Sequence, residues 1–412
     1  MTPRVWRVVG SHALAAIGMG LPWPMLLVLV DGAGSHLLLG VAGAARLAPY
    51  VALSWLSGRL ADRRERAGIV RLSVWARVGL LAACAVAMAA GAHLAAVVAA
   101  TLAVVAGTPA YPALAAGMPQ LAGAASARAT SLLVTVEVGS FVVGPALGGL
   151  LVGRAPVGAA AAVGAGACVV AGLLFRGTVL PAPVSDGAAA GAGADAVAAT
   201  GVPGVWRVVR ANRSARHALV VVATVNAALS TIGLVLIELA EHVWETGVQG
   251  FGVATAVLGF GALAAPALAG SRPMTSARGC LLVMAGAVAF VGLLPGSGAL
   301  VALATVGAVS TCCENVATGV IQACVPDTRR ASVLGLADSV MVGAALLAAL
   351  AAPWLAGLLG AVPLVLAVAL GTAVLGLIQA RRPGSHGIPT SEPHPLPRGM
   401  TGDLQVWERS IS

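Results

Sequence analysis

The sequence has few charged residues and no lysine. Only 9% of its 412 residues are charged, whereas soluble proteins have about 25%. Because 59% of the residues are hydrophobic, the chain is too apolar for a soluble domain of its length, and we predict a polytopic membrane protein. The absence of lysine excludes the phosphate-binding loop G-x-x-x-x-G-K-[ST], and with it an ATP-driven pump within this chain.

The sequence also lacks the residue spacings of enzymes and metal proteins. No Ser-His-Asp set stands out, and no cluster of His, Cys and Asp has metal-ligand spacing. The six cysteines lie in or beside apolar runs, as small packing residues do. We therefore expect no enzymatic activity, no cofactor and no metal site. The net charge of +9 comes from arginines in short loops, which orientation in a membrane explains, so no nucleic-acid partner is expected.

Twelve apolar segments are long enough to span a membrane at about 1.5 Å per residue. They divide six and six about residues 181–204, which are rich in Ala, Gly, Pro and Ser and indicate a flexible linker. We predict an N-terminal six-helix half at 1–180, a cytoplasmic linker at 181–214, a C-terminal half at 215–380 and a disordered cytoplasmic tail at 381–412. The segments centre on residues 9–30, 37–57, 69–91, 94–117, 130–153, 157–180, 215–240, 249–270, 279–295, 299–323, 331–357 and 362–380.

Loop charges predict how the chain is oriented. The arginine clusters fall in loops on one side of the predicted membrane. The loops on the other side hold Arg154 alone, together with Asp31, Glu241 and Glu245. By the positive-inside rule the side with the arginine clusters is the cytoplasm, so both termini are predicted there. We expect a monomeric multi-pass protein in contact with the lipid bilayer of a bacterial cell membrane. The arginine clusters lie at 4–7, 59–71, 128, 207–216, 272–278, 329–330 and 381–382.

Two short sequences recur at nearly the same distance. The run V-W-R-V-V begins at residues 5 and 205, which are 200 positions apart. The related runs R-A-T-S-L and R-A-S-V-L begin at residues 128 and 330, which are 202 positions apart. This repetition predicts two parallel six-helix repeats. Within the linker, the alternation of apolar residues and arginines from Val205 to His217 predicts an amphipathic helix at the membrane surface.

A burst of charge, G-R-L-A-D-R-R-E-R at residues 58–66, separates the second and third apolar segments. Such a run is predicted to be a short loop at the membrane face. Its pattern G-x-x-x-D-R-x-x-R resembles the loop signature of the major facilitator superfamily, although Glu65 stands where the family usually has glycine. The resemblance implies an all-α fold of twelve transmembrane helices. It also implies a conformational role for Gly58, Asp62, Arg63 and Arg66, with Asp62 beside the eleventh helix near Arg329 and Arg330.

The fifth apolar segment contains the run G-S-F-V-V-G-P-A-L-G-G at residues 139–149. Ser140, Gly144 and Gly148 are four residues apart and form a small-residue stripe, which favours close helix packing. A packing stripe without a further role is one reading. The whole pattern, however, resembles the fifth-helix motif of major facilitator exporters, including the multidrug and siderophore branch, and so implies export. We expect Gly144 and Gly148 to pack across the interface between the halves. The motif residues are Gly139, Gly144, Pro145, Gly148 and Gly149.

Three carboxyl groups lie inside apolar segments, on Glu137, Glu314 and Asp338. A carboxylate in a membrane is costly unless it is paired, protonated or hydrated, so we predict a role in proton coupling, with structural ion pairs as the alternative. The resemblance places helices 2, 5, 8 and 11 between the halves, which makes Arg46 a candidate partner of Asp338. His12 is expected at the cytoplasmic edge.

The resemblance also implies a central cavity lined by helices 1, 4, 7 and 10. The tenth apolar segment carries a polar stripe, which is unlike a face that meets lipid. Hydrogen bonding between helices is the alternative for each polar residue taken singly. The candidate cavity residues are Thr108, Tyr111, Asn226, Ser230, Asn315, Thr318 and Gln322.

These observations favour a secondary transporter that exports a small apolar or amphipathic compound, such as a drug or a natural product, in exchange for protons. An importer or facilitator of a polar metabolite is the first alternative. A transport-inactive signalling or scaffold protein of the membrane is the second.

Overall fold

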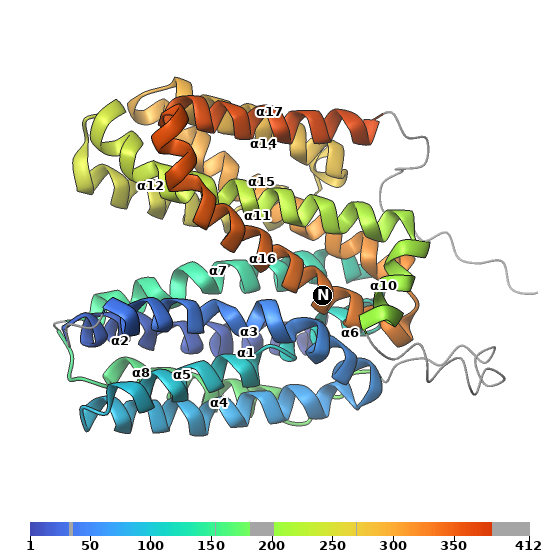
Figure 1. Ribbon diagram of the computed structural model, residues 1–412. Helices are drawn as coiled ribbons and strands as arrows, with labels where there is room; N and C mark the ends of the chain where they lie inside the picture. The colour runs from blue at the N-terminus through green and yellow to red at the C-terminus, as the bar shows by residue number, and fades with distance from the viewer. Residues whose placement is uncertain (33–35, 153, 182–201, 269, 381–412) are drawn as a thin grey trace, which may run out of the picture.

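The computed structural model describes residues 1–32, 36–152, 154–181, 202–268 and 270–380. Within them the chain is helical and contains no β-strand (Figure 1). Each of the twelve segments predicted from hydropathy contains helix. The helices are α1 (Pro3–Gly20), α2 (Pro22–Gly32), α3 (His36–Arg63), α4 (Arg66–Ala89), α5 (His93–Gly107), α6 (Ala110–Ala122), η1 (Gly123–Ala125), α7 (Ser126–Leu151), α8 (Ala159–Phe175), α10 (Val202–Ala211), α11 (Arg213–Glu238), η3 (Leu239–Val243), α12 (Gly247–Ala262), α13 (Ala265–Leu268), η4 (Arg272–Thr275), α14 (Ala277–Leu293), α15 (Gly296–Cys324), α16 (Asp327–Leu359) and α17 (Ala361–Ala380).

Seven helical stretches of the described part are long and apolar enough to cross a membrane. Three further apolar helices are shorter, at Ala159–Phe175, Gly250–Ala262 and Ala277–Leu293. Large hydrophobic side chains on several of these helices are exposed, among them Leu72 and Leu350. A soluble protein would bury such surfaces, whereas in a membrane they face lipid.

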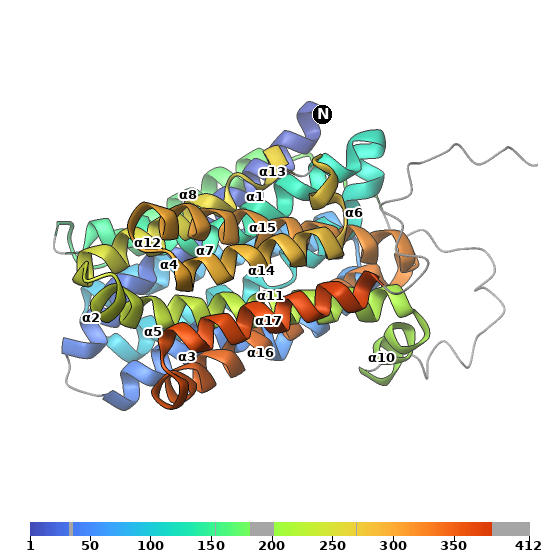
Figure 2. The same ribbon diagram turned by 90° about the horizontal axis from the view of Figure 1, so that it is seen from above.

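The helices form two groups that meet mainly through α3 with α16 and through α7. Figure 1 shows α1 to α8 in its lower part and α11, α12, α14, α15 and α17 in its upper part, with α16 crossing from the upper group onto α3. The extensive contact between α3 and α16 joins the groups, and α7 joins them again through α12, α13 and α15. Figure 2, turned by 90°, shows α16 and α3 together on one side of the molecule. We call these sets the N-terminal group and the C-terminal group.

Glycines allow the helices of the N-terminal group to approach closely. A Cβ atom added to Gly18 of α1 would lie 2.8 Å from the carbonyl oxygen of Gly164 in α8. A Cβ atom on Gly144 of α7 would lie 2.8 Å from the carbonyl oxygen of Ile17 in α1. Because lipid offers no hydrophobic driving force between helices, such backbone contacts are a main source of packing energy in membranes.

The predicted amphipathic helix is present as α10, and it is shorter than expected. α10 ends at Ala211, and the side chain of Asn212 accepts a hydrogen bond from the backbone N–H of Ala215, which starts α11 as a new helix. The predicted span of residues 205–217 therefore covers two helices, because a capping asparagine interrupts the pattern. In α10, Val209 is fully buried and Trp206 is exposed. The linker at 181–204 lies almost wholly, and the tail at 381–412 wholly, outside the described residues.

Candidate functional site

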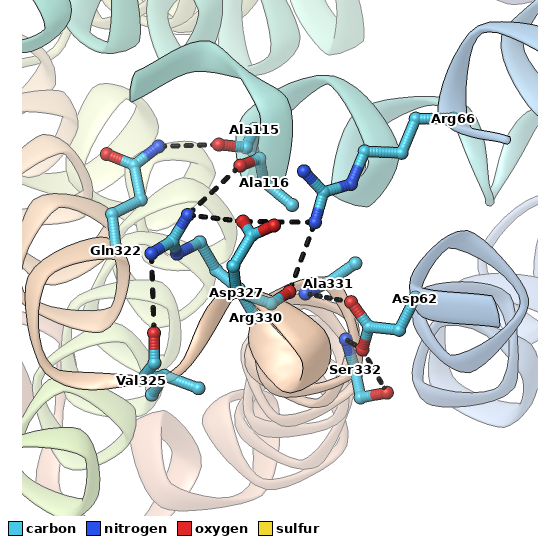
Figure 3. A network of polar contacts seen from close by, with 10 residues as sticks. All are labelled: Asp62, Arg66, Ala115, Ala116, Gln322, Val325, Asp327, Arg330, Ala331 and Ser332. Carbon is cyan, nitrogen blue, oxygen red and sulfur yellow. Dashed lines mark hydrogen bonds and ion pairs between the residues drawn. The ribbon is translucent and has the colours of Figure 1, made fainter. Parts of the chain in front are cut away.

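The loop signature forms the contact between α3 and α16. Asp62 accepts hydrogen bonds from the backbone N–H groups of Ala331, at 3.0 Å, and Ser332, at 2.8 Å, and from the Ser332 hydroxyl at 2.6 Å (Figure 3). Gly58, one turn before Asp62, lies on the backbone of the same residues, because an added Cβ atom would overlap the carbonyl oxygen of Ala331. The prediction that Asp62 lies beside the eleventh helix is confirmed. Its hydrogen-bond partners are the two residues that follow Arg330.

The partly buried position of Asp62 raises its pKa. Asp62 lies at the end of α3, beyond the apolar segment that ends at residue 57. Burial raises the pKa of Asp62 from 3.8 to about 6, although the hydrogen bonds from Ser332 and Ala331 and the charge of Arg66 act in the opposite direction. The loss of hydration therefore destabilises the charged carboxylate more than its hydrogen-bond donors and Arg66 stabilise it.

A second set of contacts links α4 to the start of α16. Arg66 is fully buried and donates to a carboxylate oxygen and to the carbonyl oxygen of Asp327, both at 3.1 Å. Arg330 donates to the same carboxylate oxygen of Asp327 at 2.6 Å, so Asp327 lies between two arginines (Figure 3). Arg63, by contrast, is exposed and makes no hydrogen bond or ion pair within the described residues. We call the end of the bundle that holds these contacts the closed end.

A proline provides a further contact at the closed end. Pro119 has no N–H group, so the carbonyl oxygen of Ala115, four residues earlier in α6, lacks its helical donor. Gln322 of α15 donates to that oxygen at 2.7 Å and accepts from the hydroxyl of Thr130 in α7 at 3.1 Å. Gln322 therefore joins the two groups of helices. The prediction that Gln322 lines the central cavity is wrong, because Gln322 is not among the residues that line it.

The two groups enclose a central cavity of ≈ 210 Å³. All three predicted carboxyl groups line it, on Glu137, Glu314 and Asp338, although they come from three different helices. Three of the predicted polar residues also line it, namely Tyr111, Asn226 and Thr318. The remaining lining is apolar and consists of Val134, Val138, Phe141, Val142, Val222, Leu229, Leu334, Ala337 and Met341.

Each carboxyl group of the cavity has a different environment. Glu314 accepts a hydrogen bond from the side-chain amide of Asn226 at 2.9 Å. Glu137 lies 2.7 Å from the Nε2 atom of His12. Asp338 is buried and forms no hydrogen bond or ion pair within the described residues. In the part of the chain that the structure describes, no group of three or more His, Cys, Asp and Glu side chains is arranged to hold a metal ion.

Sequence reasoning missed His12. We expected His12 only as a residue at the cytoplasmic edge, whereas its side chain is buried and its ring lies 6.2 Å from that of Tyr111. Its partner Glu137 is 125 residues away in the chain. The signal in the sequence was a lone histidine inside the first apolar segment.

The predicted pair of Arg46 and Asp338 is not formed. Arg46 instead donates to the carbonyl oxygen of Phe141 at 3.2 Å. Pro145, four residues later in α7, cannot donate to that oxygen, so the carbonyl is free to accept a side-chain hydrogen bond. The proline of the fifth-helix motif thereby fixes Arg46 away from the acids. Arg77 of α4 is buried and likewise donates to a backbone carbonyl, that of Gly107, at 2.9 Å.

The glycines of the fifth-helix motif pack inside the N-terminal group. Gly144 faces α1, and a Cβ atom on Gly148 would overlap the carbonyl oxygen of Leu21, between α1 and α2. The prediction that both glycines meet the opposite half is therefore wrong. The small-residue stripe indicates that some helix packs closely there, but it does not indicate which helix. Gly139 does face the C-terminal group, where an added Cβ atom would lie 3.1 Å from Leu263. Gly149 has no neighbour within 4 Å of such an atom.

The other predicted cavity residues form hydrogen bonds between helices. Thr108 is 2.9 Å from the hydroxyl of Ser57, and Ser230 donates to the carbonyl oxygen of Ala345 at 2.8 Å. Asn315 donates to the hydroxyl of Ser131 at 3.0 Å. Asn315 and Gln322 also line a separate cavity of ≈ 600 Å³ that lies to the side, between α7 and η4. The alternative reading of helix packing thus applies to these residues.

Comparison with known proteins gives a family and a fold. The family model described as Major Facilitator Superfamily matches residues 8–341. The human organic anion transporter MFSD10 (TETRAN) has a similar structure, with a TM-score of 0.70, 14% sequence identity, and coverage of 92% of this chain and 99% of that chain. The transporter FucP in its outward conformation gives a TM-score of 0.71, 14% identity, and coverage of 92% and 98%.

A bacterial homologue of the iron transporter ferroportin, in its outward-facing state, is similar too. It has a TM-score of 0.67, 16% identity, and coverage of 92% of this chain and 100% of that chain. At such identities the likeness shows the fold alone. A comparison with curated protein sequences gives no significant match.

Proposed function

The chain belongs to the major facilitator superfamily, and we propose that it is a secondary active transporter that exports a small apolar or amphipathic compound in exchange for protons. The observation that carries the proposal is the central cavity, in which three carboxyl groups meet a mostly apolar lining. An uncompensated carboxylate is costly inside a membrane, so groups of this kind readily take up and release protons as their access to water changes.

Export is supported by the fifth-helix motif and by the lining of the cavity. The run at residues 139–149 resembles the fifth-helix motif of exporters. Within it, Pro145 leaves the carbonyl oxygen of Phe141 free to accept a hydrogen bond from Arg46. Nine of the lining residues are hydrophobic, which suits an apolar body better than a sugar or another polar metabolite.

Transport driven by a pH gradient tests the proposal. The purified protein is placed in proteoliposomes with an acidic interior, and the accumulation of fluorescent amphipathic compounds, ethidium and Hoechst 33342, is followed. Exchange for protons predicts accumulation inside these vesicles whichever way the protein is inserted. Symport predicts accumulation only when the interior is alkaline, which would overturn the direction of coupling.

Amide variants of the cavity acids test the mechanism. Glu314→Gln, Glu137→Gln and Asp338→Asn are each expected to abolish gradient-driven accumulation, while exchange of labelled for unlabelled compound continues, because exchange needs no net movement of protons. Glu65→Gln is the matched control, since Glu65 lies outside the cavity with a side chain that is 60% exposed. If all three cavity variants keep gradient-driven transport, the cavity acids do not carry the proton. A protein that moves no compound under either gradient is not a transporter of this kind.

A further inference from the structure

The cavity of ≈ 600 Å³ between α7 and η4, which we call the lateral cavity, adjoins the closed end. Its lining shares no residue with that of the central cavity. α7 of the N-terminal group supplies one wall, and α15 of the C-terminal group supplies another. Gln322, which donates to Ala115 at the closed end (Figure 3), lines the lateral cavity as well. The cavity therefore lies beside the contacts that hold the two groups together.

The charge around the lateral cavity is positive. Arg128 lines the cavity, is exposed, and forms no hydrogen bond or ion pair in the part of the chain that the structure describes. η4, which also lines the cavity, carries the exposed Arg272, and the exposed Arg278 follows at the start of α14. The described lining includes no Asp or Glu, and the sequence has none in residues 119–131 or 266–279. Because a guanidinium binds phosphate and carboxylate oxygens, this cavity suits an anion.

A buried acceptor lines the same cavity. Asn315 donates its side-chain N–H to Ser131 at 3.0 Å, while its Oδ1 atom is buried and accepts no hydrogen bond within the described residues. Buried acceptors nearly always have a donor, so this atom points to a ligand with a hydroxyl or an N–H group. A cationic donor would be repelled by Arg128, which favours a neutral hydroxyl. Ser131 follows Arg128 in α7 by about 4.5 Å along the helix axis, so the anion and the hydroxyl of the ligand are a few bonds apart.

We propose that the lateral cavity binds a phosphate ester with a free hydroxyl group, either a free polyol phosphate such as glycerol 3-phosphate or the same group in the headgroup of a phosphatidylglycerol lipid, and that this ligand stabilises the closed end. The phosphate accepts hydrogen bonds from Arg128, and the hydroxyl donates to the Oδ1 atom of Asn315. Met274 and Val316 add apolar surface that covers the carbon atoms of the ligand. This ligand is distinct from the compound that the central cavity carries.

The ligand acts on closure because both groups of helices form its site. Two hydrogen bonds join α7 to α15 along the cavity, from Thr130 to Gln322 at 3.1 Å and from Asn315 to Ser131 at 3.0 Å. All four residues line the cavity. Opening of the closed end separates α7 from α15 and divides the site. A ligand that binds only the closed arrangement therefore shifts the equilibrium towards closure as its concentration rises.

A matched pair of free phosphates tests the part of the hydroxyl. Glycerol 3-phosphate has the hydroxyl groups that methyl phosphate lacks, and each is titrated by calorimetry into the protein in phosphatidylcholine nanodiscs. A free ligand predicts binding of glycerol 3-phosphate about tenfold tighter, as one hydrogen bond to a buried acceptor provides. Asn315→Ala should bind the two phosphates equally. Ser131→Ala is the matched control, because it removes the same interhelical hydrogen bond, keeps the acceptor, and should retain the difference. Measurable but equal binding of the two phosphates by the wild type overturns the proposal.

Labelling of a cysteine placed at the closed end tests closure and separates the two sources of the phosphate. A free ligand predicts that glycerol 3-phosphate lowers the labelling roughly twofold or more in phosphatidylcholine nanodiscs. A lipid ligand predicts the same fall without added phosphate when phosphatidylglycerol replaces part of the phosphatidylcholine. Phosphatidic acid, which is anionic but has no headgroup hydroxyl, is the matched lipid and should have a smaller effect. Unchanged labelling with both glycerol 3-phosphate and phosphatidylglycerol overturns the proposal, as does an equal effect of phosphatidic acid and phosphatidylglycerol.

Arginine variants locate the phosphate. Arg128→Gln should weaken the binding of glycerol 3-phosphate about tenfold or more and abolish the change in labelling, because the phosphate loses a charge-assisted donor. Arg64→Gln is the matched control, since Arg64 is an exposed arginine between α3 and α4 that does not line the lateral cavity, and it should respond like the wild type. A wild-type response of Arg128→Gln to both sources would show that the phosphate binds elsewhere and overturns the proposal.

Discussion

Asp62 contacts α16 and Asp338 lies on α16, and the surroundings of the two acids are opposite. Asp62 accepts three hydrogen bonds from Ala331 and Ser332. Asp338 lies seven residues after Ala331 on the same face of α16, about 10 Å further along the helix, and has no hydrogen bond or ion pair within the described residues. An acid whose oxygens are satisfied holds two helices together. An acid without donors is available to a proton or a ligand, so one helix, α16, takes part in both a structural contact and a chemical site.

The largest effect is expected from breaking the structural contact at Gly58. Gly58→Val would push the side chain into the backbone of Ala331, and overpacking of this kind costs about 1–3 kcal/mol. The closed end should then open, with a fall in transport of roughly tenfold or more at a cost of about 1.4 kcal/mol or above. Transport, and the labelling of a cysteine placed at the closed end, measure the two effects.

Gly149→Val is the matched control for Gly58→Val. Gly149 also lies in a membrane helix of the N-terminal group, but an added Cβ atom there meets nothing within 4 Å. A wild-type rate for Gly58→Val, with Gly149→Val equally active, would show that α3 and α16 do not need to touch during transport.

A smaller effect is expected from titrating Asp62. Its pKa is raised from 3.8 to about 6 in the closed end, chiefly by burial, so the closed end binds the proton more tightly than a solvated carboxylate does. Closure is therefore favoured below about pH 4, and this contribution is lost as the pH rises through about 6. Labelling at the closed end, divided at each pH by the labelling of the same cysteine in the unfolded protein, should increase between pH 4 and pH 6 in the wild type, because this ratio removes the pH dependence of the thiol itself.

Two variants separate the charge of Asp62 from its hydrogen bonds. Asp62→Asn, which is neutral at every pH, should show no change in this labelling ratio over the range. Asp62→Ala should leave the closed end open at every pH, because Ala331 and Ser332 lose their acceptor. Arg63→Gln, at an exposed position, should titrate like the wild type. A wild-type titration in Asp62→Asn would assign the pH dependence to another group.

The sequence predicted some of these features because their causes are local. Gly58 and Asp62 are one turn apart, so their spacing alone places them on one face of α3. Acids in apolar segments are equally visible, and all three predicted ones line the cavity. The packing of Gly144 and the pairing of Arg46 depend on which helices become neighbours, and a single sequence of apolar segments does not specify that. The contact of His12 with Glu137 was missed for the same reason.

Prolines lie between the features that the sequence predicts and those that it does not. The sequence shows which carbonyl oxygen lacks its helical donor, and the fold shows which side chain donates to that oxygen. Pro119 and Pro145 each leave a carbonyl oxygen four residues earlier without its helical donor. In both helices a side chain from a distant segment donates to that oxygen, Gln322 in one and Arg46 in the other. Proline inside these helices therefore marks places where another helix is attached.

The smallest effect on transport is expected at Gln322, because Asp62, Arg66 and Arg330 still hold the closed end together, and a double-mutant cycle tests the account of Pro119. Gln322→Leu removes the hydrogen bonds to Ala115 and Thr130 and leaves the Ala115 oxygen buried without a donor, which costs about 1–3 kcal/mol. Pro119→Ala alone supplies an N–H that competes with Gln322 for the same oxygen and should change little. In the double variant the new N–H takes over the orphaned oxygen, so part of the loss in thermal stability and in closure should be recovered. Such coupling between neighbours lies typically between about 0.5 and 3 kcal/mol. Strictly additive effects of the two substitutions would show that Gln322 and the helical N–H do not share the Ala115 carbonyl, and that Pro119 has no part in closing this end of the protein.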